Sequence, residues 1–192
     1  VGKSGTSFIT AYHLANRFCL SAMHFYAFDS FQGLPPIRGV DAEVPQFREG
    51  MYECSQEQFI AKLRRESVDL ERVTMVPGWY HEKLNEATKR TLPNLKRASI
   101  VWVDCDLYES TVPVLDFITE YITDGTIIIF DDWFCFRGSP KRGEQRAFRE
   151  WLAKHPDITA SEYYKYGFDS NSFILHRDAQ PLPTRSPGRR VY

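Results

Sequence analysis

The stretch Ser99-Ile100-Val101-Trp102-Val103-Asp104 decides the fold class of this chain, because it is an apolar run that stops at an acidic residue. A second run of the same kind, Gly125-Thr126-Ile127-Ile128-Ile129-Phe130, stops at Asp131-Asp132. Continuous apolar runs of this length are typical of strands that are buried on both faces of a parallel sheet. Between them, apolar residues at helical spacing predict a helix from Glu109 to Ile122, so the segment has a strand–helix–strand pattern.

The remaining segments repeat this alternation of strands and helices. The pattern predicts helices over 4–20, 55–67, 81–90 and 141–154, strands over 24–28 and 72–76, and a closing hairpin of 162–166 with 172–176. Such alternation predicts an α/β fold: a mostly parallel sheet flanked by helices, with a C-terminal antiparallel hairpin. Gly33-Leu34-Pro35-Pro36 opens a loop that runs to about Gly50. A loop of this length in a compact domain is often functional, for example as a lid.

The bulk composition is that of an ordinary globular protein. The 192 residues carry 24 Lys and Arg against 25 Asp and Glu, and so lack the basic excess of a nucleic-acid binder. No apolar run could span a membrane, no signal peptide is recognisable and the four cysteines form no CxxC pair, so we expect a cytoplasmic protein. The length predicts one domain, residues 1–178, followed by a flexible tail at 179–192. The oligomeric state is left open, a homo-oligomer included.

The chain opens with a glycine turn, Val1-Gly2-Lys3-Ser4-Gly5-Thr6-Ser7, that runs directly into the first predicted helix. A turn of this kind normally follows a strand, so we expect that a first strand has been truncated upstream. The N–H groups of the turn and of the helix N-terminus could bind a carboxylate or a phosphate. Gly2-Lys3-Ser4 also matches the end of a P-loop, in which Lys3 would contact phosphates and Ser4 a magnesium ion. The simplest interpretation is a glycine turn that caps the helix.

Carboxylates follow both of the apolar strands quoted above. Asp104 and Asp106 come after the first strand, and Asp131 and Asp132 come after the second. If the strands are neighbours, their ends lie within about 5–10 Å of one another, on the side where parallel sheets bind ligands. Carboxylates that close repel one another unless a cation neutralises them, and oxygen ligands suit Mg²⁺, Ca²⁺ or Mn²⁺ rather than zinc. The competing interpretation is a helix cap, which we accept for Asp106 or Asp132 taken singly.

Three further features lie after predicted strands. Asp29, followed by Ser30, ends a strand 29 − 5 = 24 residues after Gly5, and a carboxylate at that offset commonly binds the ribose hydroxyls of a nucleotide. Asp29 could equally well open the loop that follows it. Gly78-Trp79 could accept a planar ring, although a turn with a buried tryptophan explains it as well. His81 follows on the presumed ligand side and is the histidine to test as a catalytic base.

Four motifs of this chain resemble segments of the macrocin O-methyltransferase (TylF-type) family. FDSFQGLP at 28–35 resembles the family's FDSFxGLP, DCDLYEST at 104–111 its DxDLYEST, DDW at 131–133 its DD(Y/W), and VPGW at 76–79 its VxGxF with Trp for Phe. The resemblance runs from residue 1 to about residue 155, and two of the motifs are long enough that chance rarely combines them. It implies a Rossmann-like class I methyltransferase fold.

The resemblance also implies an activity and roles for individual residues. The chain would move a methyl group from S-adenosylmethionine to a hydroxyl of a small molecule such as a sugar or diol, with Mg²⁺ or another divalent cation. Asp104, Asp131 and Asp132 would bind the metal, and Asp104 is also placed like the family's proposed base. Asp29 would hold the donor's ribose, and 2–7 would match the EFGVxxGxS turn around its methionine portion. A metal lowers the pKa of a bound hydroxyl, and in-line placement of oxygen and methyl group completes the scheme.

Three other functions compete with this one. A P-loop kinase or NTPase built on Gly2-Lys3-Ser4 leaves FDSFQGLP and DCDLYEST unexplained. A non-catalytic protein that keeps the fold for binding is disfavoured by the intact acids at all three metal positions. An NAD-dependent oxidoreductase is weaker still, because the glycine spacing is not GxGxxG.

Overall fold

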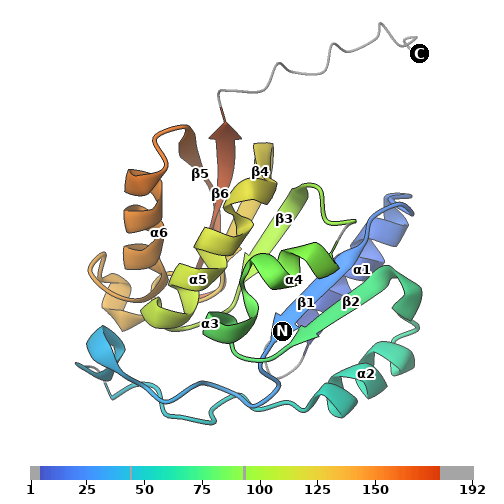
Figure 1. The fold of residues 1–192 in the computed structure, drawn as a ribbon, viewed down its shortest axis with the longest axis horizontal. Coiled ribbons are helices and arrows are strands. Elements are labelled where there is room, and N and C mark those ends of the chain that lie inside the picture. Colours follow the sequence, from blue (N-terminus) through green and yellow to red (C-terminus); the bar gives the residue numbers. More distant parts are fainter. Residues whose placement is uncertain (1–4, 44, 93, 178–192) are drawn as a thin grey trace, which may run out of the picture.

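The strands of the computed structural model form two sheets (Figure 1). The structure describes residues 5–43, 45–92 and 94–177. Within these ranges the strands are β1 (Phe25–Asp29), β2 (Val73–Pro77), β3 (Ala98–Val103), β4 (Ile122–Phe130), β5 (Ile158–Tyr166) and β6 (Ser170–Arg177). β1 pairs in parallel with β2, and the second sheet has the order β3-β4-β6-β5. β3 and β4 are parallel, whereas β6 is antiparallel to β4 and β5, so the predicted closing hairpin is confirmed.

Helices follow most of the strands, as the alternating pattern predicts. They are α1 (Thr6–Arg17), α2 (Gln56–Arg65), α3 (Tyr80–Lys83), α4 (Glu86–Thr91), α5 (Tyr108–Ile118) and α6 (Gly143–Lys154), together with short 3₁₀ turns at Gly39–Glu43, Leu70–Arg72, Thr119–Tyr121 and Phe136–Gly138. α5 and α6 lie side by side over one face of the four-stranded sheet (Figure 1). None of the described helices combines the length and the hydropathy that crossing a bilayer requires.

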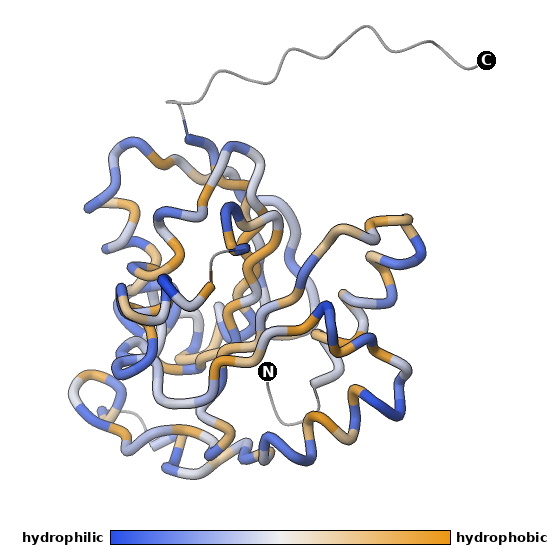
Figure 2. Tube along the Cα trace, turned by 45° about the vertical axis from the view of Figure 1, so that its right-hand side comes forward, coloured by the Kyte–Doolittle hydropathy of each residue, from blue (hydrophilic) through white to orange (hydrophobic). Residues whose placement is uncertain are grey.

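The main core lies between the four-stranded sheet and helices α5 and α6. Phe130 of β4 is fully buried, and its ring lies 4.9 Å from the ring of Phe148 on α6. Leu115 of α5 and Trp151 of α6 are buried in the same cluster. Figure 2 shows hydrophobic stretches along the strands in the interior. Burying each large side chain in this way contributes roughly 1.5–3 kcal/mol to the free energy of unfolding. This packing fixes β3 and β4 beneath the two helices.

The structure changes two of the predicted helices. The helix predicted over 81–90 is wrong as one element, because it is split into α3 and α4, and Asn85 caps α4 by accepting a hydrogen bond from the N–H of Thr88. The helix predicted to end at Ile122 stops at Ile118. Ile122 is instead the first residue of β4 and is buried in the main core, so the strand predicted to begin at Gly125 begins earlier. Helical spacing alone does not distinguish such a core strand residue from one more helical turn.

The long loop after β1 is closed at its base by two backbone hydrogen bonds. The N–H of Leu34 donates to the carbonyl of Met51 and the N–H of Gly50 donates to the carbonyl of Leu34, both at 2.9 Å. Leu34 and Phe47 are buried in a small cluster with Leu107 and Phe136. The loop is therefore attached to the body of the molecule at its base and through its apolar side chains.

Closing the loop requires a glycine at position 33, and Gly50 offers a matched control. Both glycines have a positive φ, +77° at Gly33 and +75° at Gly50, so alanine at either carries a similar strain of roughly 1–2 kcal/mol. A Cβ on Gly33 would lie 2.6 Å from the Met51 carbonyl oxygen, whereas one on Gly50 would meet nothing within 4 Å. We expect Gly33→Ala to lower the free energy of unfolding by at least about 1 kcal/mol more than Gly50→Ala. Urea denaturation measures both losses, and equal losses would contradict this account of the loop.

Candidate active site

A pocket of about 420 Å³ lies at the carboxyl ends of β1, β3 and β4. The predicted location of the site, beyond the carboxyl ends of parallel strands, is therefore the place where the structure has a pocket. Its lining combines acidic, aromatic and apolar side chains: Ser7, Asp29, Ser30, Gly33, Leu34, Pro35, Met51, Tyr52, Trp79, Tyr80, Asp104, Cys105, Asp106, Ser110, Asp131 and Asp132.

The four aspartates that follow β3 and β4 all line this pocket, because the two strands are sheet neighbours with Val103 opposite Phe130. Asp104, Asp106 and Asp132 each place a carboxylate oxygen within 4.8 Å of the other two. Asp131 lies in the same lining, and its Oδ1 accepts hydrogen bonds from the hydroxyls of Tyr166 and Ser170, both at 3.4 Å. The metal ligands predicted from the sequence are Asp104, Asp131 and Asp132. In the structure, Asp106 also belongs to this acidic cluster.

Burial and mutual repulsion act on these carboxyl groups in the same direction. Burial raises the pKa of Asp104, Asp106 and Asp132, and the negative charges of the neighbouring aspartates raise them further. Groups of this kind bind protons or cations more readily than isolated carboxylates do. An all-oxygen set of this composition suits Mg²⁺ or Mn²⁺.

Asp106 does not cap the helix that follows it, so that interpretation is wrong. Asp106 has a φ of +59°, and the N-cap of α5 is Leu107, which supplies no side-chain cap. The tight turn from Cys105 to Leu107 instead places the Asp106 side chain in the acidic pocket. Asp132 is not an N-cap either, because the 3₁₀ turn that follows it has Cys135 as its N-cap residue.

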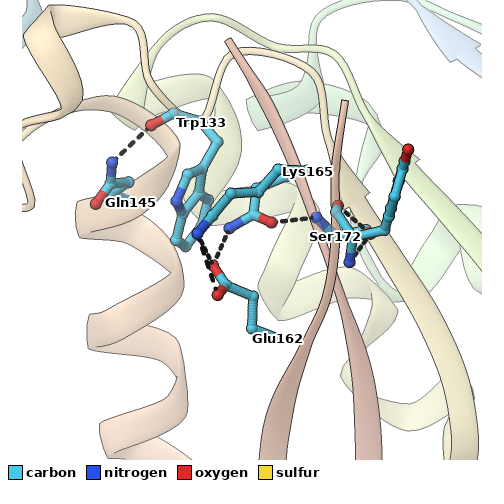
Figure 3. A network of polar contacts seen from close by, with 7 residues as sticks. Trp133, Gln145, Glu162, Lys165 and Ser172 are labelled. Carbon is cyan, nitrogen blue, oxygen red and sulfur yellow. Dashed lines mark hydrogen bonds and ion pairs between the residues drawn. The ribbon is translucent and has the colours of Figure 1, made fainter. Parts of the chain in front are cut away.

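The carboxylate of Glu144 bridges the two acidic segments that follow β3 and β4. This residue of α6 is 1% exposed, and its carboxylate accepts hydrogen bonds from the N–H of Asp132 at 3.0 Å and the N–H of Cys105 at 3.5 Å. Its neighbour Gln145 donates from Nε2 to the carbonyl of Trp133 at 2.8 Å (Figure 3). The sequence did not indicate this role, because an acidic residue in the first turn of a helix is common and needs no such partner.

Four of the residues that the sequence assigned to the cofactor, Asp29, Ser30, Gly78 and Trp79, lie at the carboxyl ends of β1 and β2. Asp29 is the last residue of β1, and its Oδ1 accepts a hydrogen bond from the N–H of Phe31 at 2.8 Å. Ser30 donates from Oγ to the carbonyl of Gly33. Gly78 donates its N–H to the carbonyl of Asp29, which joins the two strand ends, and Trp79 lines the pocket beside it.

The glycine turn at the start of the chain is only partly described. Gly2, Lys3 and Ser4 lie outside the described residues. Gly5 has a φ of +60° and is the N-cap of α1 without a side-chain cap, which agrees with a simple glycine turn. Ser7 lines the pocket, whereas Thr6 lines a separate surface groove beside α1.

His81 is not brought to the acids. It lies in α3 with 70% of its side chain exposed, and its Nε2 is 3.9 Å from Oε1 of Glu82. It is not part of the pocket lining. Tyr52 and Tyr80 do line the pocket, although sequence reasoning assigned neither to a site. Tyr80 donates its hydroxyl to the carbonyl of Phe28 at 3.2 Å. No motif pointed to Tyr52, because it lies at the end of a loop without regular periodicity.

Comparisons with known proteins agree with the fold and with the motifs. A 29% identical relative, the 8-demethyl-8-(2,3-dimethoxy-alpha-L-rhamnosyl)-tetracenomycin-C 4'-O-methyltransferase of Streptomyces olivaceus, aligns over 59% of this chain and 43% of its own length. Demethyldecarbamoylnovobiocin O-methyltransferase of Streptomyces niveus is 30% identical over 55% of this chain and 40% of its own length. The chain thus spans less than half the length of these curated relatives.

Solved structures show the same fold at lower identity. The O-methyltransferase NovP superposes with a TM-score of 0.72 at 22% identity, over 88% of this chain and 66% of that one. The calicheamicin methyltransferase CalS11 superposes with a TM-score of 0.68 at 23% identity, over 93% of this chain and 70% of that one. The predicted class I methyltransferase fold is therefore confirmed.

The family comparison separates the functions that the sequence left in competition. The model of the macrocin O-methyltransferase (TylF) family matches residues 3–159, a range that includes both the FDSFQGLP and the DCDLYEST motifs. It does not favour a P-loop enzyme or a binding protein without activity. Because the match spans well over half of the 192 residues, this chain belongs to the macrocin O-methyltransferase family.

Proposed function

We propose that this chain transfers a methyl group from S-adenosylmethionine to a hydroxyl of a small molecule. The acceptor is a sugar or another molecule with two neighbouring hydroxyls. The observation that carries the proposal is the shared pocket: Asp29 at the end of β1 faces the same cavity as the aspartates after β3 and β4. The two relatives described above are a rhamnosyl-tetracenomycin-C 4'-O-methyltransferase and a demethyldecarbamoylnovobiocin O-methyltransferase.

The donor is assigned to the β1 and β2 side of the pocket. Asp29 would accept hydrogen bonds from the ribose hydroxyls, and Ser30 would support it. The adenine ring would lie against Trp79, which lines the pocket. The missing Cβ of the neighbouring Gly78 makes room for the Lys83 side chain, so Gly78 would act by placing Trp79 rather than by contacting the ring. Ser7, which lines the pocket in the first turn of α1, would border the methionine portion, whose carboxylate suits backbone N–H groups at a helix start.

The donor set after β3 and β4 fits a divalent cation. Oxygen atoms of Asp104, Asp106 and Asp132 already lie within 4.8 Å of one another, and their burial makes the uncompensated charges costly. We assign Mg²⁺ or a similar ion to Asp104, Asp131 and Asp132, with Asp106 as the further carboxylate of the cluster. When bound, such an ion lowers the pKa of a coordinated hydroxyl and orients it.

Asp104 is the residue that we assign as the base. Asp104 belongs to the acidic cluster and lines the same pocket as Asp29, and burial and the charges of Asp131 and Asp29 raise its pKa. A carboxyl group with a raised pKa takes a proton from a hydroxyl more effectively than an ordinary one. The pocket walls would orient the hydroxyl toward the methyl group, and such orientation supplies much of the rate enhancement in reactions of this kind.

The role of Asp29 is tested by calorimetry with S-adenosylmethionine. Asp29→Asn keeps an oxygen for the N–H of Phe31 but loses the charge that would bind the ribose, so the dissociation constant should rise roughly 10-fold or more. Asp69→Asn removes a similar surface charge at a distant 3₁₀ cap and serves as the control. Unchanged affinity in Asp29→Asn would contradict the donor assignment.

The metal assignment is tested by calorimetry with Mg²⁺ on single variants. We expect Asp104→Asn and Asp132→Asn to abolish Mg²⁺ binding, because each removes a charged ligand from a cluster that would otherwise share the ion. Comparing Asp131→Asn with Asp106→Asn decides which carboxylate completes the set. If neither the original chain nor any variant binds Mg²⁺, and EDTA leaves turnover unchanged, the metal is removed from the proposal while the methyl transfer stands.

The two candidate bases are separated by turnover with methyl α-L-rhamnopyranoside as the probe acceptor. Asp104→Asn should lower kcat by about 10²–10⁴-fold, the usual effect of losing a general base. His81→Ala should stay within about twofold of the original chain, because a side chain that is 70% exposed outside the pocket does not reach the acceptor. A large loss in His81→Ala with little loss in Asp104→Asn would reverse the assignment.

A further inference from the structure

Asp41 is a buried carboxylate that the proposed chemistry does not use. It lies in the 3₁₀ turn Gly39–Glu43 of the long loop and is 2% exposed. Its two oxygens accept hydrogen bonds from consecutive N–H groups of α5, Oδ1 from Tyr108 at 3.0 Å and Oδ2 from Glu109 at 3.1 Å. α5 has no side-chain cap from its own N-cap residue, Leu107. The helix is therefore capped by a residue of a distant loop.

The same loop is also attached to the segment before α6. Arg142, the N-cap residue of α6, donates from one guanidinium nitrogen to the carbonyl of Val40 at 3.3 Å and from the other to the Glu43 carboxylate at 2.7 Å. The Glu43 side chain is 60% exposed, so this ion pair is weaker than the contacts of the buried Asp41. Asp41 is consequently the strongest polar attachment of the loop among these contacts.

The loop that Asp41 holds ends at the wall of the pocket. Met51 and Tyr52 line the pocket from the loop's far end, and Leu34 and Pro35 line it from the near end. Burial raises the pKa of Tyr52, and the charges of Asp106 and Asp132 raise it further, so the phenol lies within the field of the acidic cluster. The pocket thus has an apolar and aromatic wall on one side and carboxylates on the other. Such a cavity suits a ring that has an apolar face and hydroxyl groups at its edge.

We propose that Asp41 is a positioning residue for the acceptor side of the site. Asp41 joins the loop to the first turn of α5. It thereby fixes the distance between the pocket wall formed by Leu34, Pro35, Met51 and Tyr52 and the aspartates that come directly before α5. Tyr52 is then a specificity-determining residue whose ring contacts the apolar face of the acceptor. The Tyr52 part rests on the proposed methyltransferase function, whereas the attachment of the loop by Asp41 does not.

Limited proteolysis tests the attachment directly, because the loop carries two exposed trypsin sites, Arg38 and Arg48. Asp41→Ala should increase the rate of cleavage at these sites at least about 10-fold, since local opening of the loop loses its main polar attachment. Cleavage after Arg64 and Arg65 in α2 should stay unchanged and reports global unfolding. Asp69→Ala is the control, because the Asp69 carboxylate also accepts a hydrogen bond from a backbone N–H, that of Glu71, but lies outside the loop.

Kinetics with methyl α-L-rhamnopyranoside and S-adenosylmethionine test the consequence for the acceptor. Asp41→Ala and Tyr52→Ala should both raise KM for the glycoside at least about 5-fold while KM for S-adenosylmethionine stays within about twofold. Tyr52→Phe should retain most of the affinity, because the ring rather than the hydroxyl makes the contact. Asp69→Ala should change neither KM.

The outcomes separate the two parts of the proposal from the proposed function. Equal cleavage rates at Arg38 and Arg48 in Asp41→Ala and in the original chain would overturn the role of Asp41, whether or not the glycoside is methylated. Faster cleavage with an unchanged glycoside KM would overturn the link to the acceptor. If the original chain does not methylate the glycoside while Asp41→Ala still opens the loop, the acceptor class fails and the positioning of the loop stands.

Discussion

The parallel pairing of β3 with β4 is the constraint on which the rest of the structure depends. With Val103 opposite Phe130, both strands end at the same edge of the sheet, and Asp104, Asp106, Asp131 and Asp132 must line one pocket. The main core beneath α5 and α6 holds the strands in this register. The free energy gained by burying that core is what allows several mutually repelling carboxylates to be held together.

Buried carboxylates also arrange the segments around the pocket. Glu144 accepts hydrogen bonds from the N–H groups of Cys105 and Asp132, so one side chain bridges the two acidic segments. Asp41 does the same for the long loop and the start of α5. In both cases a carboxylate satisfies backbone N–H groups that would otherwise lack partners. The acids around the pocket thus divide into those that face it and those that hold its walls.

Sequence reasoning reached the architecture and the location of the pocket because both follow from local patterns. Apolar runs that stop at aspartates indicated β3 and β4, and the helix predicted over 55–67 is α2, which begins with a capping box of Ser55 and Gln58. It failed at Ile122, where burial in the core decides for a strand over a helix, and at Asn85, a local N-cap that divides the helix predicted over 81–90. The roles of Glu144 and Asp41 depend on partners 12 to 68 positions away, which no local pattern reveals.

The central claim is that the carboxylates after β3 and β4 form one site for a divalent cation beside the donor. Paramagnetic broadening of backbone amide signals by Mn²⁺ tests it most directly, because broadening falls steeply with distance from the ion. If these carboxylates share one ion, the amides of Cys105, Asp106 and Asp132 should broaden first, while those of α2 remain sharp. Broadening that begins elsewhere, or none at these residues at saturating Mn²⁺, would contradict the account.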